Sequence, residues 1–130
     1  MTVFLDANVV MYLIGAAHPH RDRAESLLDD LVLRDTRLVT DAEVFQEILH
    51  RYSAIRRTDA IEPAFATLTG LVDDVFPIGE DEVRAAKSLV LAGAGARDAV
   101  HVASMRTHQV DQILTFDRGF DRFDDLVRLS

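Results

Sequence analysis

Acidic side chains recur in this sequence close to the ends of short apolar or flexible stretches. They are Asp6, Glu43 with Glu47, Asp98 and Asp117. Carboxylates brought together raise one another's pKa and destabilise a fold, and a divalent cation removes that penalty. Oxygen-only ligands favour Mg²⁺ or Mn²⁺ over zinc. If the fold gathers these residues, we expect them to hold such a cation.

The elements that must position these acids alternate along the chain. Apolar patterning predicts strands at 2–5, 37–39, 75–78, 112–115 and 126–129. Helices are predicted at 7–14, 21–33, 41–55, 60–71, 80–91 and 97–108. Alternation with short links predicts an α/β fold, a three-layer α/β/α sandwich around a parallel sheet of about four to five strands. Pro77 indicates an edge position for the strand at 75–78.

Parallel sheets bind ligands beyond the carboxyl ends of their strands. Asp6 follows the first predicted strand directly, and Asp117 stands in the same relation to the strand at 112–115. Asp98 opens a helix after the Gly-Ala-Gly turn at 93–95. Each aspartate alone has an ordinary explanation as a helix cap or turn residue. Their joint placement at one sheet edge predicts a cluster.

Either of two glutamates on the predicted helix at 41–55 could supply the fourth acid of the cluster. Thr40 and Glu43 fit a capping box, in which the Thr40 hydroxyl bonds the amide of Glu43 and the glutamate reaches back to the cap. Helical spacing places Glu43 opposite the apolar face and Glu47 nearer its edge. We therefore expect Glu47 to join the cluster and Glu43 to point to water.

Length and composition limit the number of domains, the mode of nucleic-acid binding and the location of the protein. The chain has 130 residues, a net charge of −8 and no cysteine. That length predicts a single domain over residues 1–130. The acidic balance argues against binding nucleic acid through a basic face, but it permits an enzyme whose acids hold cations. We expect a cytoplasmic protein with no membrane segment, because no apolar run is long enough to span a bilayer.

Further polar residues flank the candidate cluster. Asn8 is a candidate either to hydrogen-bond the acids or to stabilise a local turn, and Thr115 projects to the same side of its strand as Asp117. Arg97 and Arg118 adjoin two of the acids and are candidates for gripping a substrate phosphate. His101 is expected on the polar side of its helix, away from a small-residue packing face.

The motifs LDANVV, RDAVHVASM and LTFDRGF, with Glu47 between the first two, resemble the PIN domain and most closely VapC-type toxins of toxin–antitoxin pairs. The resemblance covers essentially the whole chain. It implies a metal-dependent endoribonuclease that leaves 5′-phosphates, with an acidic quartet of Asp6, Glu47, Asp98 and Asp117. It also implies Mg²⁺ (or Mn²⁺), an RNA substrate, a small antitoxin partner and a homodimer.

Alternative functions remain open. Within the resemblance they are a housekeeping RNA-processing nuclease and a non-catalytic PIN-like adaptor. A haloacid-dehalogenase-like phosphatase also begins with an aspartate after its first strand. That chemistry needs a second aspartate two residues later, where this chain has Asn8. The glycines at 93–95 follow a helix and lack the third glycine of a dinucleotide-binding loop.

Overall fold

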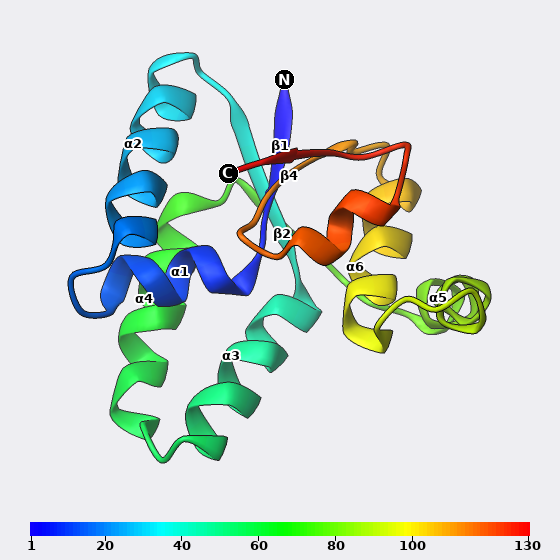
Figure 1. The fold of residues 1–130 in the computed structure, drawn as a ribbon, viewed down its shortest axis with the longest axis horizontal. Helices are drawn as coiled ribbons and strands as arrows, with labels where there is room; N and C mark the ends of the chain where they lie inside the picture. Colours follow the sequence, from blue (N-terminus) through cyan, green and yellow to red (C-terminus); the bar gives the residue numbers. More distant parts are fainter.

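A five-stranded parallel sheet forms the centre of the protein in the computed structural model, which describes residues 1–130 (Figure 1). The strands are β1 (Thr2–Leu5), β2 (Arg37–Asp41), β3 (Asp74–Phe76), β4 (Gln112–Leu114) and β5 (Val127–Leu129). Their spatial order is β3-β2-β1-β4-β5, and every neighbouring pair is parallel. The middle strand β1 aligns Phe4 with Val39 on one side and Ile113 on the other.

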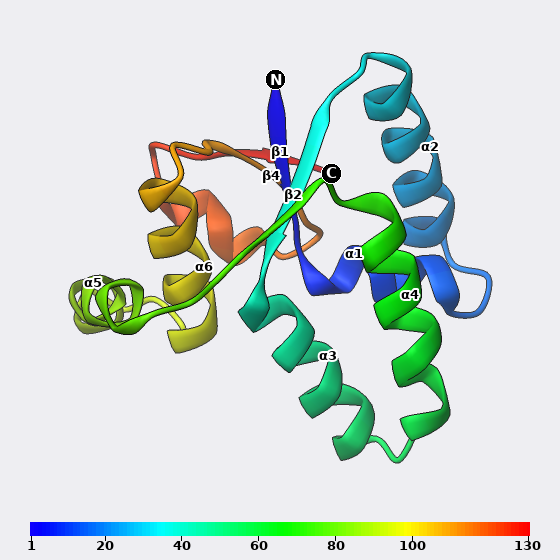
Figure 2. The ribbon, with the colours of Figure 1, turned by 180° about the vertical axis from the view of Figure 1, so that it is seen from behind.

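Six α-helices and two 3₁₀ turns surround this sheet. They are α1 (Ala7–Ile14), α2 (Pro19–Leu33), α3 (Ala42–Ala54), η1 (Thr58–Ala60), α4 (Ile61–Leu71), α5 (Glu80–Leu91), α6 (Ala96–Thr107) and η2 (Arg118–Arg122). Seen from either side, α2 and α4 lie on one flank of the sheet and α5 with α6 on the other (Figures 1 and 2). The predicted three-layer α/β/α architecture is confirmed. None of the helices combines the length and apolar character needed to cross a bilayer.

Alternation along β1 divides the buried side chains between the two faces of the sheet. Val3 and Leu5 join a cluster that includes Leu28 of α2, whereas Phe4 joins the larger cluster that includes Ile48 of α3 and Val102 of α6. A period of two in a strand produces this division. Because β1 is buried on both faces, its carboxyl end is held rigidly where α1 begins.

The structure differs from the sequence prediction mainly at element ends. Helix α2 begins at Pro19, a residue that suits the first turn because it lacks an N–H to leave unpaired. Strand β2 continues through Asp41, which the prediction had given to the following helix. The short turn η2 was not predicted. Strand β3 lies at the sheet edge, as Pro77 indicated.

Candidate metal centre

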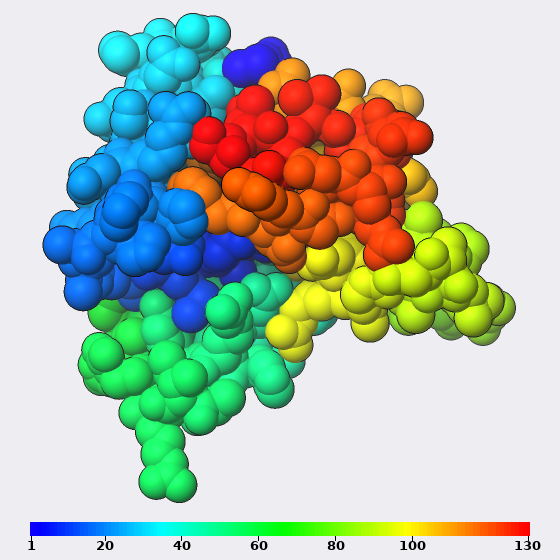
Figure 3. All heavy atoms as spheres, viewed as in Figure 1, coloured from blue at the N-terminus to red at the C-terminus, as the bar shows by residue number.

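The predicted acids lie at the carboxyl-end edge of the sheet. Asp6 joins β1 to α1, Asp117 follows β4, Asp98 lies in the first turn of α6, and Glu47 lies on α3. In Figure 3 the segment after β4 (orange), the start of α6 (yellow) and α3 (teal) border a recess on the surface of the molecule. Elements distant in sequence therefore bring carboxylates to one place.

Asp6 is the most buried of these acids. Its Oδ1 accepts the Ala7 amide at 2.8 Å, which caps α1. Its Oδ2 accepts the Thr115 hydroxyl at 2.7 Å. Burial raises the pKa of Asp6, the positive charge of His101 opposes the increase, and Glu47 adds to it. The residue is only 4% exposed, so its carboxylate is fixed in position and largely shielded from water.

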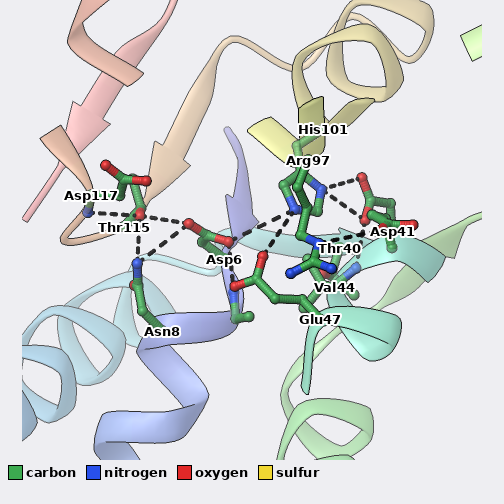
Figure 4. Close-up of polar contacts among 12 residues, drawn as sticks. Asp6, Asn8, Thr40, Asp41, Val44, Glu47, Arg97, His101, Thr115 and Asp117 are labelled. Atoms are coloured by element: carbon green, nitrogen blue, oxygen red, sulfur yellow. Dashed lines mark hydrogen bonds and ion pairs between the residues drawn. The ribbon is translucent and has the colours of Figure 1, made fainter. Parts of the chain in front are cut away.

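A small polar network holds Asp6 against the end of β4. The Asn8 amide group donates to the Thr115 hydroxyl at 3.0 Å, and its Oδ1 accepts the Phe116 amide at 3.2 Å. The Thr115 hydroxyl also accepts the Asp117 amide at 3.1 Å. These contacts join the turns that carry Asp6 and Asp117 (Figure 4). Both residues predicted to support the acids therefore lie among them.

Asp98 and Asp117 meet at Gly119. A Cβ atom at this glycine would lie 3.0 Å from Oδ1 of Asp117, closer than usual, and 3.5 Å from Oδ2 of Asp98, in ordinary contact. The Gly119 amide donates to Asp117 at 2.8 Å. Burial, with the negative charges of Asp117, Asp6 and Glu47, raises the pKa of Asp98 to about 6. The negative charges of the other three acids therefore all act on Asp98.

The two glutamates of α3 have different surroundings. The Glu47 side chain is 12% exposed, and its Oε1 lies 3.8 Å from Nε2 of His101. Burial acts to raise the pKa of Glu47, but His101 and the nearby arginines outweigh it and the pKa is lowered. Glu43 instead accepts a hydrogen bond from Arg97 at 3.3 Å and is 26% exposed at its side chain. Glu47 is thus the glutamate that faces Asp6.

The predicted capping box at Thr40 is wrong. Thr40 belongs to β2, and its hydroxyl donates to the Leu5 carbonyl at 2.9 Å across the sheet. The cap of α3 is Asp41, whose Oδ1 accepts the Val44 amide at 3.0 Å. The strand runs two residues further than predicted, which moves the helix start and removes the capping role assigned to Glu43.

The prediction for His101 is also wrong, because the ring is fully buried among the acids. Its Nδ1 lies 3.0 and 2.8 Å from the two oxygens of Asp41. Burial lowers the pKa of His101, but Asp41, Glu47 and Asp6 outweigh burial and raise it to about 10. Asp98 and His101 are three positions apart and share a face of α6, but the spacing alone did not indicate that this face is buried.

The two predicted arginines lie near the recess in different settings. Arg97 bonds Glu43 and, at 3.1 Å, the side chain of Gln46. Arg118 is exposed at the start of η2, directly after Asp117. A third arginine, Arg51, lies 3.6 Å from Oε2 of Glu47 and was not predicted. Positive side chains therefore surround the acids without neutralising Asp98.

The donor set suits a divalent metal ion. Ligand atoms of Asp6, Glu47 and His101 all lie within 4.8 Å of one another, and Asp6 is held in place by hydrogen bonds from Ala7 and Thr115. The raised pKa values of Asp6 and Asp98 indicate negative charge that a cation would offset. A cluster of carboxylate oxygens such as this one is typical of Mg²⁺ or Mn²⁺ sites.

Comparison with known proteins places the chain in a family. The model of the PIN domain family matches residues 3–126. Ribonuclease VapC13 of Mycobacterium tuberculosis is 46% identical over 130 residues, covering 98% of this chain and 99% of that protein. Ribonuclease VapC23 of the same species is 36% identical over 117 residues, covering 88% and 92%.

Solved structures share the fold. The structure of M. tuberculosis VapC20, described as a toxin that cleaves the sarcin–ricin loop, has a TM-score of 0.77 at 20% identity and covers 94% of this chain and 95% of that chain. The toxin–antitoxin structure VapBC2 of Rickettsia felis, bound to promoter DNA, gives 0.75 at 15% identity, covering 99% and 98%. With the family match, the sequence identity and the arrangement of acids, the chain belongs to the PIN domain family, among the VapC ribonucleases.

Proposed function

We propose that the protein is a Mg²⁺-dependent endoribonuclease and the toxin of a type II toxin–antitoxin pair. Asp6, Glu47, Asp98 and Asp117 would hold the metal, with Mn²⁺ as an alternative ion. The observation that carries the proposal is the clustering of these acids, and burial together with their negative charges raises the pKa of Asp98 to about 6. A fold keeps such an unfavourable charge arrangement where its chemistry needs it.

The acids of the cluster would have different roles in the proposed cleavage reaction. A bound divalent ion would neutralise charge on the phosphate and lower the pKa of the attacking water. Asp6, held by Ala7 and Thr115, fixes one side of the site. Asp98 and Asp117 define the other side around Gly119. Asp6 and Asp98 would bind the ion directly, and Glu47 or Asp117 would orient the attacking water.

A pocket beside the acids is a candidate seat for an RNA nucleotide. It has a volume of about 230 Å³ and is lined by Asn8, Met11, Tyr12 and Arg51. Arg51 also approaches Glu47, so the pocket adjoins the cluster. A guanidinium group suits a backbone phosphate, and the Tyr12 ring suits stacking with a base. With a net charge of −8, the chain needs such local contacts to retain RNA.

A cognate antitoxin and a second copy of the chain are the proposed protein partners. An apolar groove of about 410 Å³ between α5 and α6 is lined by Val83, Val90 and Leu91 among others, and Leu91 is 81% exposed. Contiguous exposed apolar surface is typical of interaction sites. The likeness to VapC ribonucleases over nearly the whole chain supports a toxin over a housekeeping nuclease. We place its activity in the cytoplasm.

Cleavage of RNA by purified protein tests the proposal. Wild-type protein should cut RNA in Mg²⁺ and leave 5′-phosphate ends, and EDTA should stop the reaction. Asp6→Asn and Asp117→Asn should each lose cleavage while keeping a folded circular dichroism spectrum. Asp124→Asn, at an exposed position in the turn between η2 and β5, is the matched control and should retain activity. Undiminished cleavage in EDTA would refute the metal mechanism. Because the protein would still be cutting RNA, the same result would also exclude a non-catalytic adaptor.

A further inference from the structure

The buried pair Asp41–His101 lies directly behind the candidate metal centre. Both residues are 0% exposed, and Nδ1 of His101 lies within hydrogen-bond distance of both Asp41 oxygens. Asp41 is itself fixed by the Val44 amide, and the Phe4 ring packs against the imidazole with centroids 5.5 Å apart. The orientation of the imidazole ring is therefore determined by its surroundings.

The other ring nitrogen points at the acids and makes no hydrogen bond. Nε2 of His101 lies 3.8 Å from Glu47 Oε1 and 4.0 Å from Asp6 Oδ1, beyond hydrogen-bond distance. Figure 4 shows the ring between Asp41 on one side and Asp6 with Glu47 on the other. A buried polar atom without a partner is rare in proteins and calls for an explanation.

We propose that His101 donates its Nε2 lone pair to the metal ion, so that the centre is a mixed nitrogen and oxygen site. The inference rests on the metal centre proposed above. A carboxylate that accepts the Nδ1–H of a histidine and leaves Nε2 for a metal is a recurring arrangement, and here Asp41 takes the carboxylate position. A ligating nitrogen must be deprotonated, so binding of the ion would release to solvent the proton that the carboxylates otherwise favour on Nε2.

The nitrogen ligand has a consequence for metal choice. Mg²⁺ is a hard cation that takes oxygen ligands, whereas imidazole favours first-row transition-metal ions. The centre should therefore bind Mn²⁺ more tightly than Mg²⁺, and His101→Gln should narrow that preference. Loss of the ligand should lower Mn²⁺ affinity by about tenfold to a hundredfold, and Mg²⁺ affinity by less.

Pulsed electron paramagnetic resonance of the Mn²⁺-loaded wild-type protein tests the proposal without a variant. We expect a directly bound ¹⁴N coupling that changes when the protein is labelled with ¹⁵N-histidine. The chain has five histidines, so assignment uses two variants. The coupling should vanish in His101→Gln and persist in His50→Gln, whose ring is exposed on α3.

The outcomes separate the inference from the proposed function. Bound Mn²⁺ with oxygen couplings only, or a nitrogen coupling that survives in His101→Gln, would overturn the nitrogen ligand and leave the acidic metal site intact. Absence of any Mn²⁺ binding, measured by titration calorimetry on the wild type, would overturn both. A nitrogen coupling specific to His101 with a reduced Mn²⁺-to-Mg²⁺ affinity ratio in the variant would establish the ligand.

Discussion

Replacing Asp98 with asparagine should stabilise the metal-free protein. The pKa of this carboxyl rises from 3.8 to about 6 because of burial and the negative charges of Asp117, Asp6 and Glu47. At pH 7 the group is mainly ionised in both the folded and unfolded chains, but its negative charge is unfavourable only in the folded chain. Asp98→Asn removes that charge but keeps the side-chain volume.

The magnitude follows from the shift in pKa. A shift of about 2 units corresponds to about 3 kcal/mol at 1.36 kcal/mol per unit. Because Asp98 is partly exposed, solvent screening reduces this to about 1–2 kcal/mol in the free energy of unfolding. For a chain of this size we expect the melting temperature to rise by about 4–7 °C. The same variant should lose Mg²⁺-dependent RNA cleavage.

Urea denaturation in EDTA between pH 3.5 and 7 is the assay. An acid whose folded pKa is raised makes the folded state less stable as pH rises from its unfolded value near 3.8 towards about 6. This loss should be present in the wild type and reduced in Asp98→Asn. The exposed control Asp124→Asn should change stability by less than about 0.5 kcal/mol. An Asp98→Asn protein that is no more stable than the wild type at pH 7 would refute the reasoning.

Further predictions concern the other residues of the cluster. Glu47→Gln should lower the initial rate of RNA cleavage by about tenfold to a hundredfold, and Glu43→Gln should leave that rate near the wild-type value. A larger loss in Glu43→Gln than in Glu47→Gln would show that Glu43 is the glutamate of the metal site. Thr115→Val removes the hydroxyl that bonds Asp6 and should cost about 1–3 kcal/mol in urea denaturation; an unchanged midpoint would show that the bond contributes nothing. His101, with a folded pKa of about 10 against 6.5, should stabilise the metal-free fold below pH 6.5 and lose that contribution as pH rises towards 10; a flat urea midpoint over this window would contradict its pairing with Asp41.

Simple rules predicted the sheet and the edge where the acids gather. Strands buried on both faces read as apolar runs, and parallel strands end at the same side of a sheet. Asp6 and Asp117 follow β1 and β4 directly, so their proximity follows from strand pairing alone. Choosing Glu47 over Glu43 required only the helical period of α3.

The histidine was beyond the same rules because α6 is not a surface helix with one buried stripe. Ala99, His101, Val102 and Met105 are all buried, so assigning one packing face to the small residues placed His101 on the wrong side. Its partner Asp41 was not recognised because strand β2 runs two residues past its predicted end. Both features depend on tertiary packing that local periodicity does not encode.

Anomalous diffraction from crystals soaked in Mn²⁺ tests the central claim most directly, namely that these acids converge to bind a divalent ion. The account predicts an anomalous peak in contact with carboxylates of the cluster formed by Asp6, Glu47, Asp98 and Asp117, absent from crystals of Asp98→Asn soaked alike. A peak elsewhere, or carboxylates that stay apart with no bound ion at saturating Mn²⁺, would contradict it.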